Sequence, residues 1–141
     1  MRARVGLKIW TNDLATAQEL GGGAEVVLLG GTLSLSQNVT TGPDAVEMME
    51  GYNVDLAFIS VGGLSAEQGL TGFDREGFIL RNAMRNAANE CYLLADTEKF
   101  GRPAPLRWKS AQTASGVICN CAPEQSVIEM LESIGLPLIL A

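Results

Sequence analysis

The chain of 141 residues contains no histidine and only three cysteines, Cys91, Cys119 and Cys121. An odd, small number of cysteines argues against a disulfide framework. In an extended segment Cys119 and Cys121 would point to the same face, so both thiols could meet one metal ion. No histidine and no second cysteine pair completes a tetrahedral set. We therefore expect no metal and no cofactor, and we predict buried or half-buried thiols.

Long apolar runs and an excess of positive charge are also lacking. No stretch approaches the roughly 20 consecutive apolar residues of a membrane helix, and no secretory signal opens the sequence. We therefore expect a cytoplasmic protein without a membrane partner. The formal net charge is −6. Because an acidic domain repels the DNA backbone, we expect any DNA-binding element to lie outside this chain.

Short apolar runs alternate with amphipathic stretches along the chain. The apolar runs predict strands at residues 5–10, 25–29, 54–61, 91–95, 115–119 and 136–140. The amphipathic stretches predict helices at residues 13–20, 43–52, 74–89 and 123–134. Apolar strands separated by helices are typical of a parallel sheet covered on both faces. We therefore predict a single α/β domain over residues 1–141, with a mostly parallel sheet and helices on both faces.

Three polar stretches interrupt this alternation, at residues 32–42, 63–73 and 97–109. Each follows a predicted strand, so we expect them at the carboxyl edge of the sheet, where open α/β sheets bind ligands. Two glycine pairs, Gly30-Gly31 and Gly62-Gly63, also stand at strand ends, where free N–H groups can hold an anion. Paired glycines are more often plain turns, however. Neither pair belongs to a G-x-G-x-x-G run or a P-loop, so a nucleotide-binding motif is absent.

The most informative stretch is residues 94–102, with the sequence LADTEKFGR. An apolar strand ends in Asp96, and Lys99 follows on the loop, two residues before Gly101. A lysine ammonium is a natural partner for a phosphate group. The alternative on spacing alone is a surface Asp–Lys pair that caps a turn.

This segment resembles the L-A-D-x-x-K-F-G-R segment of the sensor domains of DeoR-type bacterial transcriptional repressors. Further segments resemble that family in the same order and spacing. They are WTNDL at residues 10–14, VLLGGTL at 27–33, NVDLAF at 53–58, GLT at 69–71 and the terminal segment from Ala122 to Ala141. Each segment alone is unspecific, but together they cover nearly the whole chain.

The resemblance implies the α/β fold of ribose-5-phosphate isomerase and glucosamine-6-phosphate deaminase. It implies a non-enzymatic role, in which a phosphorylated sugar changes how an attached winged-helix domain holds operator DNA. By position it assigns the effector pocket to eight residues: Asn12, Gly30, Gly31, Gly62, Gly63, Asp96, Lys99 and Gly101. Lys99 would meet phosphate charge, and Asp96 would orient Lys99 or a sugar hydroxyl.

The chain departs from the family pattern in three ways. The winged-helix domain is missing, so operator DNA would be bound only through a domain absent from this chain. The first strand, phosphate loop and helix of the sensor are also missing, which leaves apolar surface and predicts a homo-oligomer. Finally, Gly62 stands where family members carry an Asp, and Gly77 stands where they carry a Glu on the long helix.

Two alternatives follow from these departures. One is a sugar-phosphate isomerase, deaminase or lactonase of the same fold. The lack of histidine and of the two carboxylates argues against it, because proton transfer needs a positioned base. The other is a module that has lost its ligand and serves only in oligomerisation, which the missing phosphate loop and the two glycines favour.

Overall fold

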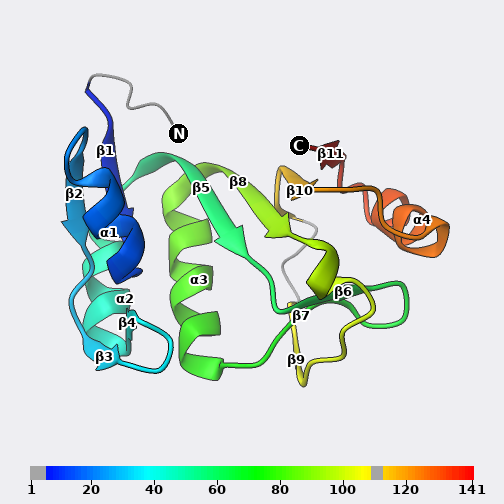
Figure 1. Ribbon diagram of the computed structural model, residues 1–141, viewed down its shortest axis with the longest axis horizontal. Helices are drawn as coiled ribbons and strands as arrows, with labels where there is room; N and C mark the ends of the chain where they lie inside the picture. Colours follow the sequence, from blue (N-terminus) through cyan, green and yellow to red (C-terminus); the bar gives the residue numbers. More distant parts are fainter. Residues whose placement is uncertain (1–5, 109–112) are drawn as a thin grey trace. The chain divides into compact units, whose positions relative to one another are not determined.

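The computed structural model describes residues 6–108 and 113–141 (Figure 1). Val5 and Lys109, which fall in the predicted strand 5–10 and the polar stretch 97–109, lie outside the described residues. The chain divides into two compact units, Met1–Tyr52 and Asn53–Ala141. We describe each unit by itself, and the single domain over residues 1–141 stays a prediction.

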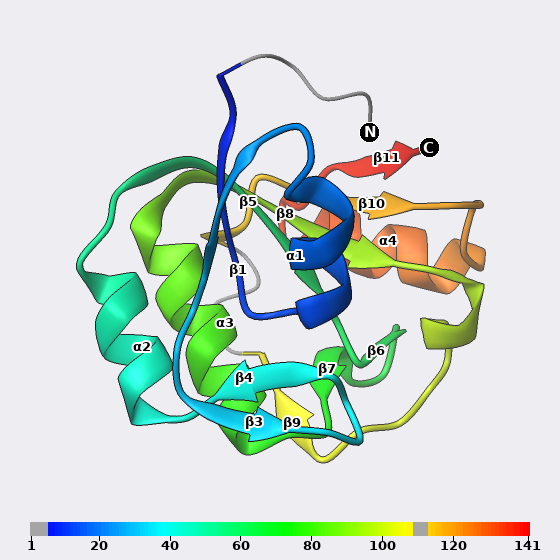
Figure 2. The same ribbon diagram turned by 60° about the vertical axis from the view of Figure 1, so that its left-hand side comes forward.

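Unit 1 combines a parallel strand pair with a hairpin and two helices. Its elements are β1 (Lys8–Thr11), α1 (Leu14–Leu20), β2 (Glu25–Leu28), β3 (Thr32–Ser34), β4 (Val39–Thr41) and α2 (Pro43–Glu50). Strands β1 and β2 run parallel, and β3 and β4 run antiparallel beside each other (Figure 2). Asp13 caps the start of α1, because its carboxylate accepts the Thr16 N–H at 2.6 Å. Pro43 takes the first position of α2, which its fixed φ favours.

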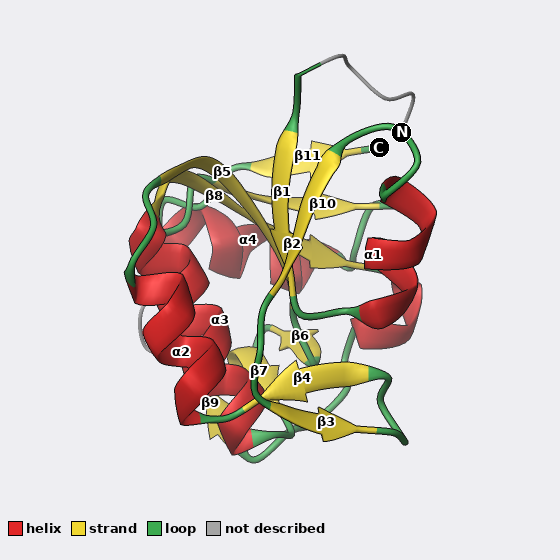
Figure 3. Ribbon diagram, turned by 90° about the vertical axis from the view of Figure 1, so that its left-hand side faces the viewer, coloured by secondary structure: helices red, strands yellow, loops and turns green. Residues whose placement is uncertain are grey.

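Unit 2 is built on a four-stranded parallel sheet with the order β11-β10-β8-β5 (Figure 3). Its elements are β5 (Val54–Ser60), β6 (Gly63–Ser65), β7 (Gly69–Gly72), α3 (Arg75–Ala87), β8 (Ala88–Ala95), the 3-10 turn η1 (Thr97–Lys99), β9 (Leu106–Arg107), β10 (Gly116–Cys119), α4 (Gln125–Ser133) and β11 (Leu138–Leu140). Strands β6, β7 and β9 form a separate antiparallel sheet. The predicted α/β class with a parallel sheet is confirmed.

The core of unit 2 lies against one face of the parallel sheet. Alternate strand residues are buried there, among them Ile59, Leu93 and Val117. Helices α3 and α4 contribute to the same core. Phe78 and Met84 of α3 are partly buried against it, and α4 buries Val127 and Leu131. The burial pattern therefore matches the period of two expected for strands and the apolar stripe expected for the helices.

The opposite face of this sheet retains exposed apolar side chains. Leu56 and Phe58 on β5 are 50% and 56% exposed, and Ile139 on β11 is 40% exposed. Phe58 stacks on Tyr92 of β8 with ring centroids 6.1 Å apart. Parallel sheets are usually covered on both faces, so these exposed apolar side chains depart from the usual pattern.

Most predicted element boundaries shift by one to three residues, and the junction of the long helix with the next strand shows why. The long helix ends at Ala87 instead of residue 89, and β8 begins at Ala88, which pairs with Val54 of β5. Pairing between strands more than 30 positions apart outweighs the local helical pattern here. The polar stretches predicted as loops form the hairpins β3–β4 and β6–β7, whose pairing is also set by contacts across each turn.

Among the described residues, no helix is long and apolar enough to cross a membrane. Within the same ranges, no group of three or more acidic, cysteine or histidine side chains is placed to hold a metal ion. Cys91 and Cys119 are buried, as predicted, whereas Cys121 is exposed, so the prediction of a buried or half-buried thiol is wrong for Cys121.

Candidate functional site

The predicted site residues of unit 1 meet at the carboxyl edge of its parallel strand pair. Asn12 follows β1, and Gly30 and Gly31 follow β2. The Asn12 amide Nδ2 donates to the carbonyl of Thr40 at 2.9 Å, and the Thr40 N–H donates to the Asn12 carbonyl at 2.9 Å. Asn12 therefore ties the end of β1 to β4, which commits its amide nitrogen to the fold.

Gly31 fills a position that only glycine suits. Its φ is +135°, and a Cβ on it would lie 2.5 Å from the carbonyl oxygen of Thr41. This close approach brings the turn after β2 against the end of β4. Gly30 is exposed, and its N–H lies 3.5 Å from the sulfur of Met48, a weak acceptor. The predicted Gly30-Gly31 turn thus has a packing role whatever it binds.

The predicted glycines of unit 2 lie together at the carboxyl end of β5. The Gly62 N–H donates to the carbonyl of Thr71 at 2.8 Å. A Cβ on Gly63 would lie 2.3 Å from the carbonyl oxygen of Arg102, so the segment that carries Lys99 passes directly over Gly63. The Gly101 N–H donates to the Leu64 carbonyl at 2.8 Å, with φ at Gly101 of +68°. The structure therefore brings Gly62, Gly63 and Gly101 into one neighbourhood.

Asp96 and Lys99 belong to the same turn after β8. One Asp96 carboxylate oxygen accepts the Glu98 N–H at 3.0 Å, and the Asp96 carbonyl accepts the Lys99 N–H at 3.0 Å. Asp96 thus shapes η1 as its capping residue, and it holds Lys99 through the backbone rather than through an ion pair. Lys99 is half-buried, and its ammonium forms no hydrogen bond or ion pair with residues 6–108 or 113–141. Its charge is therefore available to an anion.

Gly62 and Gly77 have close neighbours of different kinds. A Cβ on Gly62 would lie 2.8 Å from Cα of Gly72, which is backbone, so a side chain has no room there. A Cβ on Gly77 would lie 2.6 Å from the Asp74 carboxylate and 3.2 Å from the Arg81 guanidinium, which are ends of side chains and can move. Asp74 caps α3 by accepting the N–H groups of Glu76 and Gly77 at 3.2 and 2.9 Å.

Arg81 on α3 is half-buried. Burial lowers the pKa of its guanidinium, and the nearby Asp74 carboxylate partly opposes this shift. Arginine remains protonated at neutral pH in spite of such a shift. Arg81 therefore places a fixed positive charge beside the start of α3.

Two contacts of this region were missed from the sequence. The Arg102 guanidinium lies 4.6 Å from the centre of the Phe73 ring, a cation–π distance. The Trp108 indole Nε1–H donates to the Asn82 amide oxygen at 2.9 Å. A tryptophan directly after a polar loop was the only available sequence signal, because the partner residues lie 26 or more positions away.

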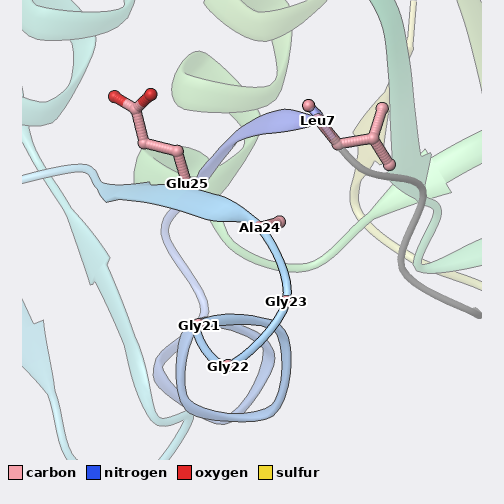
Figure 4. Close-up of a pocket in the computed structure, with 7 residues that line it drawn as sticks. Leu7, Gly21, Gly22, Gly23, Ala24 and Glu25 are labelled. Atoms are coloured by element: carbon pink, nitrogen blue, oxygen red, sulfur yellow. The ribbon is translucent and has the colours of Figure 1, made fainter.

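An open hollow in unit 1 lies away from the predicted residues (Figure 4). It is lined by Gly6, Leu7, Gly21, Gly22, Gly23, Ala24 and Glu25. These residues surround the amino ends of β1 and β2, whereas Asn12 and Gly30 follow the carboxyl ends. Glu25 is paired with Lys8 at 2.8 Å. The hollow therefore offers mainly glycine backbone and one neutralised carboxylate, which is a poor basis for specific recognition.

Comparison with known proteins identifies the family. The model of the DeoR C-terminal sensor domain matches residues 1–120. The transcriptional repressor GlcR of Bacillus subtilis is 28% identical over 138 residues, which cover 96% of this chain and 53% of that protein. The regulator GolR of Listeria innocua is 26% identical, over 96% of this chain and 54% of that protein. The deoxyribose operon repressor of Escherichia coli K12 is 24% identical, over 75% and 42% respectively.

The chain spans about half the length of the curated relatives it matches. The match extends over both units and includes Asn12, both glycine pairs and the segment from Asp96 to Gly101. The chain therefore belongs to the family of DeoR C-terminal sensor domains.

Proposed function

We propose that this chain senses a phosphorylated sugar and thereby controls a DeoR-type repressor of sugar-metabolism genes. The family match supports a sensor role, and the relatives described above are transcription regulators rather than enzymes. That is the ground for proposing a sensor instead of an isomerase or deaminase. The sensor works in the cytoplasm, where phosphorylated sugars are formed.

The observation that carries the proposal is the placement of Lys99. It stands on a turn directly after the carboxyl end of a parallel strand, with its charge unpaired among the described residues. Gly62, Gly63 and Gly101 lie nearby, but the N–H groups of Gly62 and Gly101 donate to the carbonyls of Thr71 and Leu64, and Gly63 is buried. Recognition of an anionic group would therefore depend on Lys99, and a direct charge-assisted hydrogen bond from it would be strong. A role for Asn12, Gly30 and Gly31 of unit 1 in effector binding stays a prediction.

The binding test is a calorimetric titration of this chain with phosphorylated sugars, using ribose 5-phosphate, glucose 6-phosphate and fructose 6-phosphate. Lys99→Ala should weaken binding about ten- to hundred-fold, because a hydrogen bond to a charged group contributes roughly 1.5–3 kcal/mol. Lys99→Arg keeps the charge but changes its geometry, so its affinity should be intermediate. Lys8→Ala removes the same charge at the amino end of β1 and is the matched control. Equal affinity of Lys99→Ala and wild type would remove Lys99 from the site.

The regulatory test uses the intact repressor, since operator DNA is proposed to be held by a winged-helix domain outside this chain. A ligand shifts a conformational equilibrium only through different affinities for the two states. We expect the sugar phosphate to weaken operator binding, and Lys99→Ala to raise the effector midpoint while leaving effector-free operator affinity unchanged. An operator-binding titration against graded effector measures both quantities.

A homo-oligomer is also proposed, through the uncovered side of the unit 2 sheet. Strand β5 is an edge of that sheet, carries neither lysine nor proline, and exposes Leu56 and Phe58 by half or more. Natural edge strands are usually protected by lysine or proline, or by a covering element. Light scattering should show a dimer or larger species that Phe58→Lys dissociates. A strictly monomeric wild type at high concentration would contradict this.

The second candidate is an oligomerisation module without a ligand. The filled space at Gly62 favours it, because a carboxylate that could hold a sugar hydroxyl has no room there. Thermal unfolding with the same sugar phosphates separates the two candidates. A sensor should be stabilised by at least one of them, since binding to the folded state alone raises its stability. The module would show no shift with any.

A further inference from the structure

Trp108 closes the segment that carries Lys99. We call residues 96–108 the strap. Trp108 is 7% exposed, and its Nε1–H donates to the Asn82 amide oxygen of α3 at 2.9 Å. The indole ring also packs edge-on against Phe78 of α3, with centroids 6.0 Å apart. The end of the strap is therefore attached to α3 by one directional hydrogen bond and one aromatic contact.

The strap is attached to the β6–β7 hairpin in a different manner. The Gly101 N–H donates to the Leu64 carbonyl at 2.8 Å, and the Trp108 N–H donates to the Leu70 carbonyl at 2.9 Å. These backbone bonds do not depend on side-chain identity. Between them, Arg102, Pro103 and Pro105 are exposed. Side chains thus connect the strap to α3, whereas its hydrogen bonds to the hairpin are mostly between backbone groups, with one from the Ala104 N–H to the Gln68 side chain at 3.4 Å.

We propose that Asn82 is a positioning residue for the effector site, holding Trp108 so that the strap presents Lys99 and moves together with α3. This rests on the proposed function, in which Lys99 meets the anion. A buried indole N–H without an acceptor costs free energy, so the strap favours the arrangement in which the Asn82 amide oxygen accepts the hydrogen bond of Trp108. An anion that binds Lys99 more tightly in this arrangement than in others is therefore coupled to the position of α3.

The attachment itself is tested without ligand, in a Trp10→Phe background that leaves Trp108 as the one tryptophan of the chain. Asn82→Ala should shift Trp108 emission to longer wavelength and increase its quenching by acrylamide. Asn82→Asp keeps an acceptor oxygen and should resemble the parent. Asn86→Ala removes an exposed asparagine one turn further along α3 and is the matched control. Unchanged emission and quenching in Asn82→Ala would overturn the proposal.

The coupling is tested by titrating each variant with inorganic phosphate, ribose 5-phosphate and glucose 6-phosphate. Loss of one ordinary hydrogen bond corresponds to about five-fold weaker binding if the site needs the attached strap. Trp108→Phe keeps an aromatic ring, loses the N–H and should show the same weakening, which guards against misfolding of a single variant. Asn86→Ala should bind like wild type.

The outcomes are distinct. Equal affinity of wild type, Asn82→Ala and Trp108→Phe would overturn the coupling. If the wild type binds none of the three anions, the proposed function fails and the coupling fails with it. The ligand-free emission of Asn82→Ala still decides separately whether Asn82 holds Trp108.

Discussion

The contact between the strap and Gly63 makes a quantitative prediction for Gly63→Ala. The added Cβ would lie 2.3 Å from the Arg102 carbonyl oxygen and 2.7 Å from the Thr71 hydroxyl, whereas ordinary contacts begin at 3.4 Å. The strap or the hairpin must therefore move apart by about an ångström. Overpacking of this kind costs roughly 1–3 kcal/mol, and the loss of backbone freedom in the unfolded chain returns about 0.4–1 kcal/mol. We expect the free energy of unfolding of unit 2 to fall by about 1–2 kcal/mol.

Denaturant unfolding followed by Trp108 fluorescence in the Trp10→Phe background measures this change in unit 2. Limited trypsin digestion adds a local reading, because Lys99 and Arg107 are cleavage sites on the strap, whereas Pro103 protects the bond after Arg102. Gly22→Ala is the control, since a Cβ there meets nothing within 4 Å. If Gly63→Ala unfolds like wild type and resists trypsin equally, the close approach of the strap to Gly63 is wrong.

Two further predictions concern the cap of α3 and the buried thiols. Asp74→Ala removes the acceptor of two backbone N–H groups, so the free energy of unfolding of unit 2, measured with denaturant, should fall by about 0.5–2 kcal/mol. Arg75→Ala, at the exposed neighbouring position, should lower it less. An equal loss in both variants would contradict the capping role. Burial raises the pKa of Cys91, an effect that Arg85 partly opposes, and burial followed by the charge of Cys121 raises the pKa of Cys119. The folded state therefore favours the neutral thiols. The free energy of unfolding should be constant below the unfolded thiol pKa of about 8.5 and should fall as pH rises above it. A free energy of unfolding that rises with pH in this range would contradict the burial. A thiol reagent at pH 8 should label exposed Cys121 first, and rapid labelling of all three thiols in the folded protein would refute the assignment.

Much of the fold could be predicted because its signals are local. The apolar periodicity of residues 74–89 predicted α3, and Leu80 and Ala83 are buried as that periodicity requires. Asp13 and Asp74 stand at the starts of α1 and α3, where capping residues are expected. The two hairpins and the last turn of α3 could not be predicted, because they depend on pairing with residues distant in sequence.

The candidate site divides in the same way. The positions of Asp96 and Lys99 after a strand followed from the sequence, since apolar runs end where the sheet ends. The closure of space at Gly62 did not, because it depends on Gly72. The cation–π contact of Arg102 with Phe73 and the hydrogen bond of Trp108 to Asn82 were equally inaccessible, since no local pattern specifies their partners.

The most direct measurement of the central claim is a residue-resolved NMR titration of this chain with a set of phosphorylated sugars. The account predicts that the largest amide shifts fall on Gly62, Gly63, Lys99 and Gly101, with smaller changes along α3, and that Lys99→Ala removes them at the same ligand concentration. Shifts concentrated instead at Gly21–Gly23, or an absence of shifts with every phosphorylated sugar tested, would contradict it.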